Sequence, residues 1–126
     1  MKTKQSNKKA ALDFFRMIIA RNINEAYEKY VDMKGKHHNQ FFSKGFPALK
    51  AAMIENHAKF PKTKMVVKHV LEDGDFVATH SHVVHIPGQA GVMVFHLVRF
   101  KNSKIVEMWD CGQPIPADSP NKDGPF

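Results

Sequence analysis

The sequence has little of several features that would assign a protein to a class at once. Its 126 residues include a single cysteine, Cys111, so it offers neither an intrachain disulfide nor a thiolate metal cluster. No segment approaches the roughly 18 consecutive apolar residues of a membrane-spanning helix. The basic start of the chain continues into an amphipathic pattern instead of the apolar run of a signal peptide. We therefore expect a cytoplasmic protein with no membrane partner.

Acidic residues are also scarce. Asp and Glu number 12 against 19 Lys and Arg, which gives a formal charge of +7. Such a charge could attract nucleic acid. The lysines are scattered along the chain, however, and accompany no DNA- or RNA-binding motif. A solvated surface accounts for them, and we expect no nucleic-acid partner.

The length suits one domain, residues 1–126, with helices in its first half. A first helix is predicted from apolar residues that share one helical face, namely Ala11, Phe14, Phe15, Ile18 and Ile19. Asn24 can cap a shorter second helix, which Gly35 breaks. A third helix is predicted from Pro47 to the stop at Pro61.

The second half changes to the alternation of β-strands from Met65 onward. Turn residues divide it into four predicted strands, near 64–72, 75–86, 91–101 and 104–112. The sequence therefore predicts an α+β fold in which three N-terminal helices pack on a curved antiparallel sheet of about four strands.

The last predicted hairpin allows its register to be argued. If Lys101 pairs with Ile105 across a three-residue loop, Phe100 faces Val106, Val98 faces Met108 and His96 faces Asp110. The same register sets Arg99 beside Glu107, an opposite-charge pair that supports it. Asp110 then points into the interior opposite His96.

The same alternation can be extended to the preceding predicted strand. If the even-numbered residues stay on one face of the sheet across the Pro87-Gly88 turn, His80 and His82 lie on the face of Asp110. The opposite face carries apolar residues, namely Met93, Phe95, Leu97, Trp109 and Cys111. Because the helices can cover only one face, we expect a homodimer through the outer face of the sheet.

Asp110 is the candidate catalytic residue. Burial disfavours the charged form of a carboxylate, so this group can take and return a proton near neutrality. His96 could hold it or stabilise an enolate oxygen, while His80 or His82 could orient a carbonyl. The pattern favours proton abstraction beside a carbonyl without a cofactor. Alternatively, Asp110 caps the turn into Gly112.

A metal site is a further alternative. Gly74 followed by His80-Ser81-His82 resembles the opening of a cupin motif, and His96 could be the third ligand. The glutamate expected three or four residues beyond His82 is absent, because Ile86 and Pro87 stand there. The other histidines, His37, His57, His69 and His85, show no clear spacing and are predicted to lie on the surface or in loops.

Several short segments of the chain form a recognisable set, namely residues 74–80 (GDFVATH), residues 104–110 (KIVEMWD), residues 113–116 (QPIP), the late Asn121 and the terminal Phe126. Together they resemble SnoaL-like polyketide cyclases, which belong to the nuclear-transport-factor-like superfamily that also contains ketosteroid isomerases. The resemblance covers most of the chain. It implies a cone-shaped fold with a deep pocket between sheet and helices, and a dimer through the outer face.

The resemblance also implies roles for single residues. It makes Asp110 the acid/base residue, with Trp109 beside it, and His96 a polar pocket residue. His38 and Asn39 match a pair that enters the same pocket, and His80 matches a histidine near it. Two positions depart from the usual pattern: Gln40 replaces a proline, and Met108 replaces a histidine before the tryptophan. Met108 and Trp109 are expected to contact the ligand.

Three hypotheses follow for function. The first is a cyclase or isomerase of a small, apolar carbonyl compound, with Asp110 as base. The second is a binding module of the same fold that holds a small ligand without chemistry. The third is a histidine-bound metal site.

Overall fold

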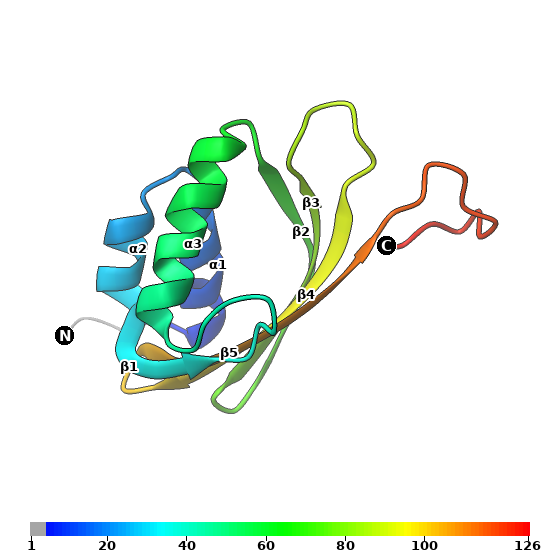
Figure 1. Cartoon of the computed structure of the whole chain (residues 1–126). Helices are drawn as coiled ribbons and strands as arrows, with labels where there is room; N and C mark the ends of the chain where they lie inside the picture. The colour runs from blue at the N-terminus through cyan, green and yellow to red at the C-terminus, as the bar shows by residue number, and fades with distance from the viewer. Residues whose placement is uncertain (1–4) are drawn as a thin grey trace.

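In the computed structural model, which describes residues 5–126, three helices cover one face of a curled sheet (Figure 1). The helices are α1 (Asn7–Ile19), α2 (Ile23–Tyr30) and α3 (Phe46–Lys59). The strands are β1 (Val31–His37), β2 (Lys64–Asp73), β3 (Phe76–Val84), β4 (Val92–Lys101) and β5 (Lys104–Pro114). The predicted α+β class is confirmed. Residues 1–4 of the predicted domain lie outside the described part.

Three helices form in the predicted regions, but α2 begins at Ile23, so Asn24 lies inside it and not at its cap, and it ends at Tyr30, well before Gly35. In α1, the Ser6 side chain accepts a hydrogen bond from the Lys9 amide at 3.1 Å, which caps the first turn. The apolar stripe of α1 is buried against the sheet. Pro47 lies in the first turn of α3, where its missing N–H costs nothing, and Pro61 follows the end of that helix. None of the helices in residues 5–126 is long and apolar enough to cross a membrane.

The sheet has five strands in the order β1-β5-β4-β3-β2, not the predicted four. The additional strand, β1, was predicted as the end of a helix and a loop. It pairs in parallel with β5, far away in the chain, whereas the other pairs are antiparallel. Its sequence is mostly polar and shows no clean alternation, so it carries no strand signal of its own. Gly35 allows close packing there, because a Cβ would meet the Val106 carbonyl.

The hairpin of β4 and β5 has a shorter turn than predicted, and only its pairs beyond a bulge agree with the predicted register. Lys101 faces Lys104 across a two-residue turn in which Asn102 and Ser103 both have positive φ. Phe100 therefore faces Ile105, and the predicted pairs at this end of the hairpin are wrong. A bulge then shifts the register by one residue. Beyond it, Arg99 faces Glu107 and His96 faces Asp110, as predicted.

The predicted face of β3 is wrong. Val83 pairs with Val92 across residues 84–91, an even number of connecting residues. The parity therefore changes between the strands, and the odd-numbered residues of β3 share the face of His96 and Asp110. Three of them are buried beneath the helices, namely Val77, Thr79 and Ser81. His80 and His82 lie on the outer face instead.

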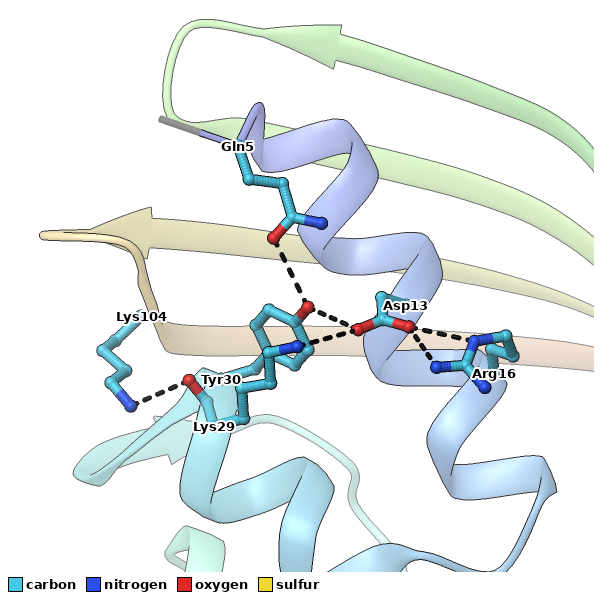
Figure 2. A network of polar contacts seen from close by, with 6 residues as sticks. All are labelled: Gln5, Asp13, Arg16, Lys29, Tyr30 and Lys104. Carbon is cyan, nitrogen blue, oxygen red and sulfur yellow. Dashed lines mark hydrogen bonds and ion pairs between the residues drawn. The ribbon is translucent and has the colours of Figure 1, made fainter. Parts of the chain in front are cut away.

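Polar contacts tie α1 to the end of α2 (Figure 2). The Asp13 carboxylate accepts hydrogen bonds from the Tyr30 hydroxyl and the Arg16 guanidinium, each at 2.5 Å. The Lys29 ammonium lies 3.5 Å from the same carboxylate. Lys104, at the start of β5, donates to the main-chain carbonyl of Lys29 at 2.8 Å. The end of α2 is thereby joined to both α1 and the sheet.

The C-terminal tail returns to the outer face of the sheet. The Phe126 ring lies 4.9 Å from the ring of His82 and 5.4 Å from that of His80, measured between centroids. Lys68 lies 5.3 Å from the same ring. These contacts hold the end of the tail against the outer face of the sheet.

Candidate active site

Asp110 lies on the inner face of β5, next to a pocket of about 570 Å³. The register places it directly opposite His96 of β4. The pocket is lined by the sheet, the loop after β1 and the segment after β3, through His38, Asn39, Gln40, Phe41, His85, Val92, Val94, Asp110, Cys111 and Gly112. The carboxylate is therefore at the edge of a space large enough for a small organic molecule.

Asn39 holds the Asp110 carboxylate. Its side-chain Nδ2 donates to both carboxylate oxygens, at 3.0 Å each. Its Oδ1 accepts from the Phe41 amide at 2.9 Å, which settles the orientation of the side-chain amide. These two hydrogen bonds fix the position of the Asp110 side chain at the pocket. Asn39 also lies in the lining of this pocket.

His37 supports Asn39, a contact that the sequence did not reveal. The His37 ring donates through Nε2 to the main-chain carbonyl of Ser43 at 2.7 Å. Its Nδ1 can therefore accept a hydrogen bond from the main-chain N–H of Asn39, at 3.2 Å. His37 is buried, as is His57, and their predicted surface or loop positions are wrong. The only available signal was that His37 directly precedes the His38-Asn39 pair.

His96 faces the interior in an apolar setting. The Phe15 ring of α1 lies 4.7 Å from the His96 ring, between centroids. Burial lowers the pKa of His96 below the usual 6.5, and the negative charge of Asp110 only partly opposes this. At neutral pH the ring is therefore uncharged and has one N–H donor. Its Nδ1 is shielded from solvent and has no hydrogen-bond partner in residues 5–126.

His38 points to the other side of the sheet. Its ring stacks on Trp109, with centroids 4.9 Å apart, and its Nε2 lies 2.6 Å from Oε2 of Glu107. The hydrogen bond from His38 is the main reason why the pKa of Glu107 is lowered. His38 is among the residues that line the pocket, but its ring is turned toward Trp109 and Glu107, whereas the Asn39 side chain meets Asp110.

The side chains of Trp109 and Met108 also point to opposite faces of the sheet. Trp109 lies on the outer face, where its ring is 6.2 Å from that of Phe76. Met108 is buried on the inner face, opposite Val98. Neither residue lines the pocket beside Asp110. Met108 thus belongs to the buried core on the inner face of the sheet, and Trp109 packs on the outer face.

His80 and His82 lie on the outer face, so they cannot orient a ligand beside Asp110. The His80 ring stacks on Phe95 at 4.5 Å between centroids, and His82 Nε2 donates to the Ala90 carbonyl at 2.7 Å. His96 lies on the opposite face, so these three histidines do not share a metal ion. Throughout residues 5–126, no three His, Cys, Asp or Glu side chains gather in a geometry for a metal ion.

The remaining polar groups can support acid/base chemistry. Asp110 can accept a proton, Asn39 can keep the carboxylate in position, and the neutral His96 ring can donate one hydrogen bond. Apolar side chains of β4 line the same pocket. Such an arrangement suits a small, mostly apolar ligand that carries a polar group at one end.

Comparisons with known proteins agree with this architecture. A structure described as an NTF2-like protein of unknown function from Cytophaga hutchinsonii has a TM-score of 0.71 at 18% identity, covering 90% of this chain and 96% of its own. IdmH from Streptomyces antibioticus, a proposed polyketide cyclase, has a TM-score of 0.71 at 14% identity, covering 86% and 93%. At these identities the likeness establishes the NTF2-like fold.

A third structure, a proposed polyketide cyclase from Acidithiobacillus ferrooxidans, has a TM-score of 0.69 at 18% identity, covering 90% of this chain and 92% of its own. A comparison with curated protein sequences gives no match. The family profile described as SnoaL-like polyketide cyclase matches residues 9–117, which include every strand and nearly all of the helices. The chain therefore belongs to the SnoaL-like polyketide cyclase family.

Proposed function

We propose that the protein is a cyclase or isomerase that abstracts a proton beside a carbonyl group without a cofactor. The observation that carries the proposal is the pairing of Asp110 and Asn39 at one pocket, with His96 directly opposite Asp110 in the sheet. The Asp110 carboxylate takes the proton from the carbon next to the carbonyl, and the electron pair of the C–H bond forms an enolate. A hydrogen bond from the neutral His96 ring stabilises the enolate oxygen.

Two outcomes are open to this enolate. In a cyclisation, its carbon attacks a second carbonyl of the same molecule, and the new alkoxide receives the proton from Asp110. In an isomerisation, Asp110 returns the proton to another carbon. Asp110 ends each cycle as the carboxylate with which it began, so no co-reactant is consumed. The substrate is a small, mainly apolar carbonyl compound.

Hydrogen–deuterium exchange at the α-carbon of small ketones in D₂O tests the base. The variant Asp110→Asn should lower the exchange rate at least 100-fold, because an amide cannot accept the proton. Asp118→Asn, a matched change at an exposed carboxylate of the tail, should leave the rate unaltered. Exchange by Asp110→Asn at the parent rate would show that Asp110 is not the base.

A binding module is the second candidate. It is favoured by the two hydrogen bonds from Asn39, which occupy both oxygens of Asp110. In that case ketones bind saturably, with chemical-shift changes at Val92 and Val94, but their α-protons do not exchange. Exchange that depends on Asp110 would exclude this candidate.

We also propose a homodimer through the outer face of the sheet. That face is apolar over four strands, because Leu71, Ala78, Leu97 and Trp109 are successive partners across it. The helices cover the opposite face (Figure 1). A second copy would remove exposed apolar side chains such as Leu71 and Phe95 from water.

A further inference from the structure

Within residues 5–126, three buried side-chain polar atoms on the inner face of the sheet have no hydrogen-bond partner. They are the Thr79 and Ser81 hydroxyl oxygens and Nδ1 of His96, and all three are shielded from solvent. The exposed fraction is 2% for Thr79 and 0% for Ser81. Most buried polar groups in native proteins are paired, because an unpaired one loses its hydrogen bonds to water without replacement. Three such atoms therefore need a physical explanation.

The three atoms belong to one patch. Thr79 faces His96 directly across β3 and β4, and Ser81 is the next residue of β3 on the same face. Neighbouring strands lie about 4.8 Å apart, and same-face residues of a strand about 6.6 Å apart. The Phe15 ring of α1 covers the patch, at 4.7 Å from the His96 ring. A single small group held between these side chains could reach all of them.

The patch lies beside two hollows. Val94, the partner of Ser81 on β4, lines the pocket next to Asp110. Val67, the partner of Ser81 on β2, lines a smaller hollow of about 190 Å³ under α1. Phe15 lines that second hollow as well. The patch thus continues the inner surface of the Asp110 pocket toward α1.

We propose that Thr79, Ser81 and His96 form a binding site for one neutral oxygen atom. Each hydroxyl can donate or accept a hydrogen bond, and the neutral imidazole offers one further donor or acceptor at Nδ1. The three side chains carry no formal charge, and the nearby Asp110 carboxylate disfavours an anion. The oxygen belongs either to an internal water molecule or to the carbonyl or hydroxyl group of a ligand.

Occupation of this site orients the His96 ring. Once Nδ1 is engaged by the oxygen, the protonation of the two ring nitrogens is set by that contact. Thr79 is then a positioning residue that acts through His96. If the oxygen is the ligand's, and this part rests on the proposed function, the substrate carries two oxygen functions. One lies near Asp110, and the other lies one to two strand spacings away, roughly 5–10 Å.

The variant Thr79→Val tests the site in the ligand-free protein, because valine keeps the branched shape and removes the hydroxyl. If an internal water is bound, the melting temperature should fall by roughly 3–6 °C. The ¹⁵N signals of the His96 ring should shift as well. Thr79→Ser, which keeps the hydroxyl, should restore the His96 signals. Ser81→Ala provides the same comparison if Thr79→Val does not fold.

A second experiment measures the affinity for two probes, namely 1,3-cyclohexanedione, which has two carbonyl oxygens, and cyclohexanone, which has one. If the ligand supplies the oxygen, Thr79→Val should melt no lower than the parent protein. It should bind the dione about 10-fold more weakly than the parent protein does, whereas its affinity for the monoketone should be unchanged. The proposal is overturned if Thr79→Val alters neither the His96 signals nor the affinity for the dione. No readout here measures proton exchange, so failure of the Asp110 proposal would be seen separately.

Discussion

At the level of single residues, the two ionisable groups of the site lie in different surroundings. Asp110 borders the pocket and accepts hydrogen bonds from Asn39, whereas His96 lies deeper, against Phe15. Burial lowers the pKa of His96, and the charge of Asp110 opposes this only in part. The His96 ring is therefore uncharged at pH 7, and a neutral imidazole beside Asp110 is what the proposed mechanism uses.

This difference predicts a dependence of stability on pH. As the pH falls below the usual histidine pKa of 6.5, the unfolded chain takes up a proton at His96 that the folded protein resists. The free energy of unfolding should therefore decrease from about pH 6.5 downward, toward the lower pKa of the folded protein. Urea unfolding at about pH 7.5 and 5.5 should show a smaller loss for His96→Gln than for the parent protein.

His57 should contribute in the same direction. Burial lowers its pKa, and the nearby positive charges of His85 and Arg21 lower it further. His57→Gln should thus remove another part of the pH dependence. Carboxylates such as Asp13 act in a separate window, because their pKa is lowered from 3.8. An unchanged pH dependence in both histidine variants would contradict the assigned burial.

At the level of elements, α1 and α2 are joined through Asp13 (Figure 2). The hydrogen bond from Tyr30 is the largest cause of the lowered pKa of Asp13, followed by that from Arg16. Burial acts the other way and raises it. The carboxylate thus stabilises the fold above pH 3.8, and this contribution is lost as the pH falls through the lower, folded pKa.

Removing the Tyr30 hydroxyl should therefore weaken the contact between these helices. Tyr30→Phe should lower the free energy of unfolding by about 1 kcal/mol at neutral pH, measured by urea unfolding. Tyr27→Phe is the control, because among the described residues the Tyr27 hydroxyl donates a hydrogen bond only to the sulfur of Met53, at 3.2 Å. Equal losses in the two variants would mean that the Asp13 contact adds nothing specific.

The strands show which elements could be predicted from the sequence. Strands β2 to β5 alternate and end at turn residues, so they could be placed to within about two residues. Strand β1 could not, because its polar sequence becomes a strand only by pairing with β5. The bulge between β4 and β5 was likewise missed, but it compensated for the shorter turn and left the pairing of His96 with Asp110 as predicted.

At the level of the whole molecule, the outer face of the sheet remains open. Leu71 is 71% exposed and Phe95 is 45% exposed, on a face that the helices do not cover. His80, His82 and the tail residue Phe126 gather on the same face. A dimer through this face would bring the tails of both copies to the interface.

Sedimentation should accordingly find a dimer at micromolar concentration. Leu71→Glu should raise its dissociation constant at least 10-fold, because a carboxylate would be buried without a partner. Leu71 is already exposed within one copy, so the monomer should fold normally. Ile54→Glu, a similar change on the exposed side of α3, should leave the dimer intact. A parent protein that sediments only as a monomer would refute the interface.

The sequence by itself determined the α+β order, the strands of the hairpins and the pairing of Asp110 with His96. These follow from alternation and short turns, which depend on residues close together in the chain. Only the tertiary structure decided that Asn39 and not His38 meets Asp110, since that contact joins residues far apart. It also decided that Thr79 and Ser81 replace His80 and His82 on the inner face. That choice depended on the number of residues between β3 and β4, because one residue more or fewer exchanges the two faces of a strand.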